Sequence, residues 1–304
     1  SLASEAERQW ANLQLIHAPL QLGERTVRLD QPQIMGVLNV TPDSFSDGGE
    51  FLEKPEAGRA HAAAMLEAGA AIIDIGGESP RPGAAEVAAD AEIARTAPVI
   101  GAIRAKSAVP ISIDTRKSDV GLAALSAGAT MINDVAAFTF DPMLADVAAK
   151  AGVPVCVMHA QGTPETMQDD PNYDDVLLDV YDFLLARIDA AVGAGIQRDQ
   201  IVVDPGIGFG KTHTHNIELM QKASRFLDLG CPILVGHSRK GFLGKLIKHT
   251  LNRDGSTHER DIATAASACS LADQGIHILR VHDVATVRLA LTAYASSKKK
   301  VSQL

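Results

Sequence analysis

The segment DPGIGFGKT, from Asp204 to Thr212, has the composition of a loop that binds phosphate. Its glycines alternate at positions 206, 208 and 210, and a Lys-Thr pair follows them. A P-loop, however, needs a glycine where this chain has Pro205, and a dinucleotide-binding loop needs G-x-G-x-x-G instead of G-x-G-x-G. We therefore interpret the segment as a loop after a strand. Asp204 points into a site there, and the glycines let the backbone and Phe209 approach a ligand closely.

Two further motifs resemble patterns of catalysis or metal binding but depart from them. GHSRK, residues 236–240, approaches the G-x-S-x-G turn of serine hydrolases but has Lys240 in place of the last glycine. Ser238 is therefore interpreted as a hydrogen-bond donor and not as a nucleophile. His213 and His215 in THTHN could ligate a metal, but no carboxylate or thiol neighbours them, so we expect a solvated loop there.

A regular fold must position these residues, and the chain repeats one unit: a helix-like stretch, a glycine and a short β-rich run. Glycine at a helix C-terminus provides a left-handed cap, and the apolar run after it is typical of a strand buried on both faces. With QIMGVLNV and PISIDT, the repeats predict eight strands. The unit recurs as EAGAAIIDIGGE, SAGATMINDVAA, KAGVPVCVMHA, GAGIQRDQIVVD, LGCPILVGH and QGIHILRVH.

Helical patterns separate these strands, with apolar residues at spacings of three and four. Strict alternation of strand and helix implies parallel pairing. Eight such units favour an α/β fold, a single closed (β/α)8 TIM barrel, over an open doubly wound sheet. We expect residues 1–32 to be an N-terminal extension that covers the barrel bottom, residues 33–297 to form the barrel, and residues 298–304 to be a flexible tail.

The C-terminal end of every predicted strand carries hydrogen-bonding or charged side chains, whereas the N-terminal ends are apolar or proline. In barrel enzymes the C-terminal ends form the rim of the active site. A single such residue could equally cap the next helix, but eight that converge at one rim indicate a site. In strand order they are Asn39; Asp74 and Glu78; Asp114; Asn133 and Asp134; His159; Asp204; Ser238, Arg239 and Lys240; Arg280 and His282.

Composition and charge narrow the classes of function. The chain has 304 residues, a net charge of −9 and 46% hydrophobic residues, which argues against binding to nucleic acid or to an anionic membrane. An anionic substrate would therefore need a local basic cluster. The sequence contains no apolar run of membrane-spanning length and no secretory signal pattern. We expect a cytoplasmic protein in which Cys156, Cys231 and Cys269 are buried free thiols.

Eight segments resemble, in order and spacing, those of the bacterial dihydropteroate synthases. The resemblance implies a barrel enzyme that joins p-aminobenzoate to the pterin of 6-hydroxymethyl-7,8-dihydropterin pyrophosphate and releases pyrophosphate. It also implies Mg²⁺ as the cofactor, a homodimer, and inhibition by sulfonamides. The segments are MGVLNVTPDSFSDGG, DIGGESPRPGA, SIDT, INDV, VMH, DPGIGFGK, GHSRKGF and RVHDV.

The resemblance assigns roles that suit the chemistry of the residues. Asp114 and Asp204 suit the donor-rich pyrimidine edge of a reduced pterin, and Arg280 and His282, two apart on one strand face, suit the oxygens of pyrophosphate. The assigned pterin ligands are Asp114, Asn133, Met158, Asp204, Phe209 and Lys240; the pyrophosphate ligands are Asn39, Arg81, Arg280 and His282; the p-aminobenzoate pocket is Pro80, Arg81, Pro82, Phe209, Ser238 and Lys240; the metal ligand is Asn39; and the catalytic residues are Asp114, Asp204, Lys240, Arg280 and His282.

The chain departs from the family at Pro80, where most members have threonine. Either the loop is preorganised with intact activity, or its affinity for p-aminobenzoate and sulfonamides is altered; we favour altered affinity with retained activity. Three other functions stay open: a methyltetrahydrofolate-dependent methyltransferase, an aldolase that uses Lys240 as a Schiff base, and a non-catalytic pterin-binding paralogue. The cluster of Arg81, Arg280 and His282 favours the synthase, because no pyrophosphate leaves in the methyltransferase.

Overall fold

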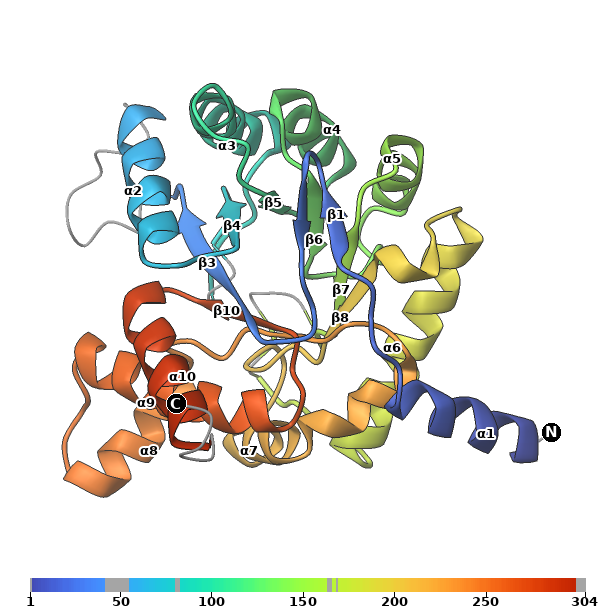
Figure 1. The fold of residues 1–304 in the computed structure, drawn as a ribbon, viewed down its shortest axis with the longest axis vertical. Helices are drawn as coiled ribbons and strands as arrows, with labels where there is room; N and C mark the ends of the chain where they lie inside the picture. The colour runs from blue at the N-terminus through green and yellow to red at the C-terminus, as the bar shows by residue number, and fades with distance from the viewer. Residues whose placement is uncertain (1, 42–54, 80–82, 163–165, 168, 299–304) are drawn as a thin grey trace.

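The computed structural model describes residues 2–41, 55–79, 83–162, 166–167 and 169–298, in which strands form the centre and helices surround them (Figure 1). All eight predicted strands are present in one sheet. They are β3 (Gln33–Asn39), β4 (Ile72–Gly76), β5 (Ile111–Asp114), β6 (Met131–Asp134), β7 (Val155–Met158), β8 (Ile201–Asp204), β9 (Leu234–Val235) and β10 (Ile278–Val281).

The sheet closes on itself to form a barrel. Neighbouring strands follow the order β8-β7-β6-β5-β4-β3-β10-β9, and these pairs are parallel. A parallel bridge between Val203 in β8 and Ile233, which precedes β9 by one residue, joins the two remaining edges. The (β/α)8 barrel is thus confirmed, and the open sheet is excluded.

Helices connect the strands and pack on the outward-facing strand residues. The predicted glycine caps are confirmed at Gly128 and Gly152, which take left-handed conformations at the ends of their helices. Two helices, not one, separate β9 from β10. The helices of the described residues are α1 (Leu2–Leu13), α2 (Pro55–Glu67), α3 (Ala89–Arg104), α4 (Ser118–Ala127), α5 (Met143–Ala151), α6 (Val176–Gly193), η2 (Arg198–Gln200), α7 (His213–Gln221), η3 (Ala223–Leu229), α8 (Gly241–Leu251), α9 (Thr257–Asp273) and α10 (Val284–Lys298).

The interior of the barrel changes from apolar to polar along its axis. Strand residues alternate between the interior and the surrounding helices. Near the N-terminal strand ends, the inward residues Met35, Ile72 and Met131 form a fully buried apolar layer. Two residues further along β4 the inward position is Asp74, and the last inward residue of β5 is Asp114. The polar layer therefore lies at the C-terminal ends, where the sequence predicts the site.

The N-terminal extension closes the opposite end of the barrel. Strands β1 (Leu20–Leu22) and β2 (Arg25–Val27) form an antiparallel hairpin, whose Leu20, Leu22 and Val27 pack against the apolar layer. The expectation of a covered bottom is confirmed for this hairpin. Helix α1 instead projects from the body (Figure 1) and packs against η3, where Asn12 Nδ2 donates to the carbonyl of Asp228 at 2.6 Å.

The expectation of a solvated loop at His213 and His215 is wrong, because both residues lie in the first turn of α7. Thr212 caps that helix: its side chain accepts the N–H of His215, and the ring of His215 accepts the N–H of Thr212. Helix α10 continues to Lys298, one residue beyond the expected end of the barrel, and residues 299–304 lie outside the described residues.

No helix within the described ranges is both long and apolar enough to cross a membrane. Cys156 and Cys231 are buried free thiols, as expected. Cys269 is only half buried, because it lies at the edge of the buried face of α9.

Candidate active site

Four residues lie in register at the polar end of the barrel. Asn39, Gly76, Asp114 and Asn133 are successive partners across β3, β4, β5 and β6. A Cβ atom at position 76 would lie 3.4 Å from Oδ1 of Asn39 and 3.5 Å from Cβ of Asp114. Because residue 76 is glycine, no side chain fills the space between the amide of Asn39 and the carboxylate of Asp114.

Arg280 in β10 links the carboxylates of two other strands. Its Nε donates to Asp74 Oδ2 at 2.6 Å, and its Nη2 donates to Asp114 Oδ2 at 2.7 Å. The same oxygen of Asp74 accepts Nδ2 of Asn133 at 3.2 Å. Burial alone would lower the pKa of Arg280. The two carboxylates outweigh this effect and raise the pKa above its ordinary value, so the guanidinium stays cationic.

Asp74 is a site residue to which the sequence assigned no role. It is fully buried in the middle of β4. The sequence does contain a signal for this role. Successive strand residues face opposite sides, so Asp74, two residues before Gly76, faces the barrel interior as Gly76 does. Its pairing with Arg280, 206 residues away, is visible only in the folded protein.

The two predicted pterin carboxylates are both costly to ionise. Burial raises the pKa of Asp114 to about 7, against the lowering effect of Arg280. Burial also raises the pKa of Asp204 to about 6, although its Oδ1 accepts the N–H of Gly206 at 2.7 Å and Lys240 lies nearby. Hydrogen bonds from a donor-rich ligand would stabilise the ionised form of such buried carboxylates.

Lys240 and Phe209 meet at the mouth of the barrel. The Lys240 Nζ atom lies 3.9 Å from the centre of the Phe209 ring. Burial and the neighbouring Arg280 lower the pKa of Lys240 to about 8. Phe209 also packs with Met158 and Met167 in a small apolar cluster. The predicted pterin-contacting side chains Met158, Phe209 and Lys240 are thus brought together.

Ser238 lies beside His282. Its hydroxyl accepts the backbone N–H of His282 at 3.2 Å and lies 3.0 Å from ring Nδ1. Ser238 is 4% exposed, so its contact with the imidazole is shielded from water. Arg239, which the sequence placed in the same polar group, turns outward instead and forms two hydrogen bonds with Asp261 on α9, at 2.6 and 2.8 Å.

Two glycines of the loop after β8, Gly206 and Gly210, pack against the chain that follows β7. A Cβ atom at Gly206 would lie 1.8 Å from the carbonyl oxygen of His159, and one at Gly210 would lie 2.3 Å from that of Gln161. Both glycines have positive φ, 69° and 62°. Gly206 and Gly210 thus allow close approach of the chain that follows β7, whereas a Cβ atom at Gly208 would lie 3.0 Å from Cδ of Lys240, a predicted pterin ligand.

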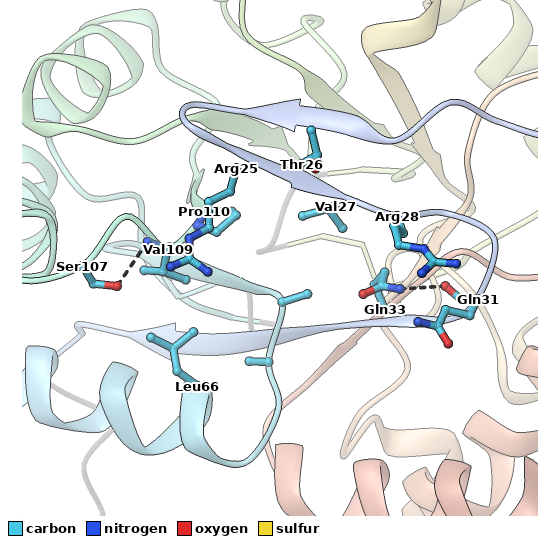
Figure 2. Close-up of a pocket in the computed structure, with 12 residues that line it drawn as sticks. Arg25, Thr26, Val27, Arg28, Gln31, Gln33, Leu66, Ser107, Val109 and Pro110 are labelled. Atoms are coloured by element: carbon cyan, nitrogen blue, oxygen red, sulfur yellow. Dashed lines mark hydrogen bonds between the residues drawn. The ribbon is translucent and has the colours of Figure 1, made fainter. Parts of the chain in front are cut away.

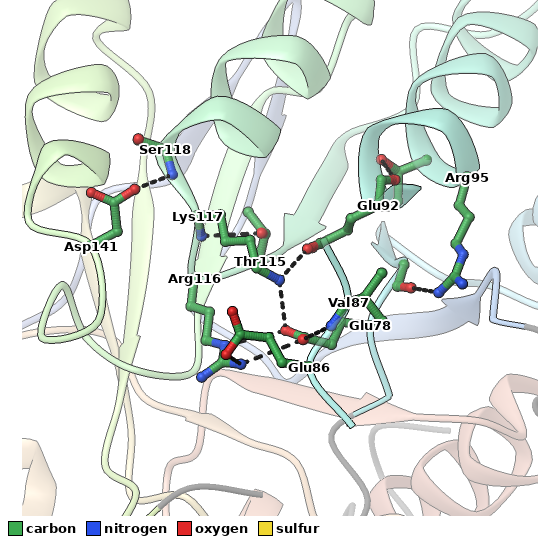
Figure 3. A network of polar contacts seen from close by, with 12 residues as sticks. Glu78, Glu86, Val87, Glu92, Arg95, Thr115, Arg116, Lys117, Ser118 and Asp141 are labelled. Atoms are coloured by element: carbon green, nitrogen blue, oxygen red, sulfur yellow. Dashed lines mark hydrogen bonds and ion pairs between the residues drawn. The ribbon is translucent and has the colours of Figure 1, made fainter. Parts of the chain in front are cut away.

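A network of charged residues lies at the ends of β4 and β5 (Figure 3). Glu78 Oε2 accepts Lys117 Nζ at 3.1 Å and Arg116 Nε at 3.2 Å, and Glu78 Oε1 accepts the N–H of Val87 at 2.8 Å. Lys117 also pairs with the fully buried Glu92, at 2.7 Å. The network fixes the chain segments that follow these two strands.

Two cavities lie at opposite ends of the barrel. One, of about 480 Å³, lies between the N-terminal hairpin and the N-terminal strand ends, beside Arg25 and Arg28 (Figure 2), and no predicted site residue lines it. The other, of about 240 Å³, opens at the C-terminal rim. Asp114 and Phe209 line it, so we take it as the candidate substrate cavity. Its other lining residues are Glu78, Ser79, Thr115, Arg116, Val135, Ala136, Thr139, Phe140, Ala160, Gly162 and Met167.

The remaining predictions concern the second loop and the metal. Pro80, Arg81 and Pro82 lie outside the described residues. Across the described ranges, no group of three or more His, Cys, Asp or Glu residues could hold a metal ion. Asn39, the predicted metal ligand, lies at the end of β3 on the polar side of the barrel.

Comparison with known proteins places this site in a family. The family described as pterin binding enzyme matches residues 35–282. A dihydropteroate synthase of Escherichia coli K12 is 44% identical over 256 residues, which cover 84% of this chain and 88% of the relative. One of Synechocystis is 45% identical over 251 residues, covering 83% and 85%.

Solved structures agree with this assignment. A Yersinia pestis dihydropteroate synthase in complex with a sulfonamide drug superimposes with a TM-score of 0.86 at 42% identity, covering 92% of this chain and 99% of the other. A Xanthomonas albilineans dihydropteroate synthase with 4-aminobenzoic acid gives a TM-score of 0.84 at 42% identity, covering 93% and 98%. With its barrel, its rim of inward carboxylates and these relatives, the chain belongs to the family of pterin binding enzymes.

Proposed function

We propose that the protein is a dihydropteroate synthase, a transferase that condenses p-aminobenzoate with 6-hydroxymethyl-7,8-dihydropterin pyrophosphate and releases pyrophosphate. The observation that carries this proposal is the inward-facing set of Asp74, Asp114 and Arg280 at the barrel rim. The relatives add support, since one Xanthomonas albilineans dihydropteroate synthase holds 7,8-dihydropteroate and is 40% identical to this chain.

Recognition of the pterin rests on Asp114, Asp204 and Asn133. The pyrimidine edge of a dihydropterin presents N–H donors, and each carboxylate can accept two of them. Asn133 donates its amide N–H to Asp74, which fixes the orientation of the amide so that its oxygen faces away from that residue. Burial makes these acceptors selective, because a ligand that lacked the donors would leave the carboxylates unsatisfied.

Lys240, Phe209 and Met158 border the flat ring. Phe209 and Met158 belong to one apolar cluster, which suits the face of a heterocycle. In this proposal Lys240 donates to the pterin carbonyl and borders the p-aminobenzoate pocket; its position 3.9 Å from the Phe209 ring centre supports both roles. Pro80, Arg81, Pro82 and Ser238 complete the proposed p-aminobenzoate pocket.

Arg280 and His282 neutralise the leaving pyrophosphate. The guanidinium is already cationic and oriented by Asp74, so no reorganisation is required as negative charge develops. His282 is held by the hydroxyl of Ser238. Arg81 supplies a further positive charge. This cluster is how a protein of net charge −9 binds an anion.

Asn39 is the proposed Mg²⁺ ligand, and its surroundings suit this ion. Its side-chain oxygen borders the space above Gly76, on the other side of which lies Asp114. Mg²⁺ commonly takes one or two protein oxygens and completes its shell with water and substrate phosphates. When bound, the ion offsets the negative charge of the pyrophosphate.

The reaction proceeds by loss of pyrophosphate and then attack of the amine. The C–O bond breaks first, and the electron pair leaves on the pyrophosphate, which Arg280 and His282 stabilise. The dihydropterin ring stabilises the resulting methyl cation. The aryl amine, held beside Phe209 and Lys240, forms the C–N bond and releases one proton. No covalent protein intermediate forms, and the chain contributes positioning and charge neutralisation.

A pyrophosphate-release assay tests this function. The purified protein receives the pterin pyrophosphate, Mg²⁺ and p-aminobenzoate, and each is omitted in turn. We expect coupled release of pyrophosphate and 7,8-dihydropteroate only with the complete mixture. Binding of the pterin without release would indicate a non-catalytic paralogue. Irreversible inactivation by borohydride with a carbonyl substrate would indicate a Schiff base on Lys240 and contradict the synthase.

We further propose that the enzyme is a cytoplasmic homodimer inhibited by sulfonamides. Large apolar side chains are exposed along three helices that follow β9: Leu246 on α8, Ile262 on α9 and Leu289 on α10 are 46%, 51% and 72% exposed. Exposed apolar side chains of this size suit burial against a second copy. Sedimentation at micromolar concentration should give twice the mass of the chain, and a monomer would contradict the dimer.

A further inference from the structure

Lys211 is a buried lysine to which the proposed reaction gives no role. It follows the glycines of the loop after β8 and is 2% exposed. Its Nζ lies 2.8 Å from ring Nδ1 of His159, 3.0 Å from the carbonyl oxygen of Phe209 and 3.4 Å from that of His159. Burial lowers the pKa of Lys211 to about 7, and the three acceptors satisfy all three hydrogens of its ammonium form without water.

These contacts join two loops of the site. His159 directly follows Met158 at the end of β7, and Phe209 lies on the loop after β8. The N–H of His159 also donates to the carbonyl of Asp204, the last residue of β8, at 3.0 Å. Gly206 has no room for a side chain against His159. The two loops therefore form one packed unit, with Lys211 at its centre.

The imidazole of His159 is itself held in place. Its ring packs edge-on against Phe183, with ring centres 4.9 Å apart, and lies 5.9 Å from the ring centre of Tyr173. Burial, with the adjacent Lys211, lowers the pKa of His159 to about 3. The imidazole is therefore neutral at physiological pH, and Nδ1 accepts from Lys211 when its proton is on Nε2.

We propose that Lys211 is a positioning residue for the pterin site: by donating to the carbonyls of Phe209 and His159, it holds Phe209 and the neighbouring Met158 in place at the border of the site for the flat ring. The proposal rests on the proposed function, because it takes the pterin as the ligand. Lys211 acts through other residues and does not touch the substrate.

Calorimetry with a pterin that lacks the pyrophosphate group tests the proposal without requiring turnover. Lys211→Met keeps the apolar stem and removes all three hydrogen bonds. We expect its Kd for the pterin to rise by about tenfold or more, because the carbonyls of Phe209 and His159 lose the donor that positions them. Lys222→Met is the matched control: it lies at the other end of α7, half exposed, paired with Glu218, and its Kd should equal that of the wild type.

A second variant covers the case in which Lys211→Met does not fold. His159→Phe removes the ring acceptor but keeps the carbonyl at 159 and an aromatic ring against Phe183, so we expect a smaller rise in Kd. A folded Lys211→Met with an unchanged Kd, or His159→Phe with an unchanged Kd when Lys211→Met does not fold, would overturn the proposal. A wild type that binds the pterin but releases no pyrophosphate would instead refute the proposed function alone.

Discussion

Replacing Asp74 by asparagine isolates the ion pair that orients Arg280. Asp74 is fully buried, and its Oδ2 accepts Arg280 Nε at 2.6 Å. Asparagine has the same shape and keeps an acceptor, so the hydrogen bond from the cationic guanidinium remains but the negative charge of its partner is lost. Hydrogen bonds to charged groups contribute about 1.5–3 kcal/mol; we expect the bond between two opposite charges to lie near the upper end of this range and the bond with one charged partner near the lower end. A difference of about 1–1.5 kcal/mol corresponds to a loss of about five- to twelvefold in kcat/KM for the pterin pyrophosphate.

Steady-state pyrophosphate release at varied pterin pyrophosphate measures this loss. Asp30→Asn is the matched control, because Asp30 forms an exposed pair with Arg28 at the opposite end of the barrel. We expect Asp30→Asn to leave kcat/KM unchanged, and thermal unfolding should show that both variants fold. If Asp74→Asn matched the wild type, the orientation of Arg280 by Asp74 would have no part in catalysis.

Three further predictions concern pH, the second loop and the glycine loop. The raised pKa values of Asp114 and Asp204, about 7 and 6, mean that the unliganded native state binds more protons than the unfolded chain. The free energy of unfolding contributed by these groups should therefore fall as pH rises from about 4 to 7, whereas the affinity for the pterin should rise. Denaturant titrations measure the first trend and calorimetry measures the second across this range. A contribution to stability that rose with pH, or an affinity that fell, would contradict the assigned ionisation. Pro80→Thr should change the KM for p-aminobenzoate and the Ki of sulfonamides while activity persists, and identical values would show that the substitution is neutral. Gly206→Ala should destabilise the protein by about 3 kcal/mol or more, because it combines positive φ with a clash against the carbonyl of His159; an unchanged Tm would contradict this.

Much of the barrel follows from local chemistry that the sequence displays. Six of the eight strands are short β-rich runs after a glycine at the end of a helix-like stretch, and Gly128 and Gly152 show the capping directly. The two-residue alternation then settles which side chains face inward, so the sequence alone is enough to assign Asp114, Asp204 and Arg280 to the barrel interior. The parallel order of the strands follows from their alternation with helices.

Contacts between distant segments could not be derived in this way. The pairing of Arg280 with Asp74 and Asp114 depends on the closure of the barrel, which pairs the last strand, β10, with the first, β3. The sequence predicts that the loop glycines let the chain approach a ligand. It does not predict that Gly206 and Gly210 pack against the segment after β7, because nothing in the local sequence indicates this contact between distant segments. The cap at Thr212, by contrast, had a signal, since threonine is a favoured residue at a helix N-terminus.

The central claim is that buried carboxylates at the barrel rim bind the pterin, and calorimetry of Asp204→Asn tests it most directly. Asp199→Asn is the control, because Asp199 lies exposed in η2 at the other end of β8. We predict that Asp204→Asn keeps its fold and binds a pterin at least about tenfold more weakly, while Asp199→Asn binds like the wild type. An Asp204→Asn variant that bound the pterin as tightly as the wild type would contradict the account.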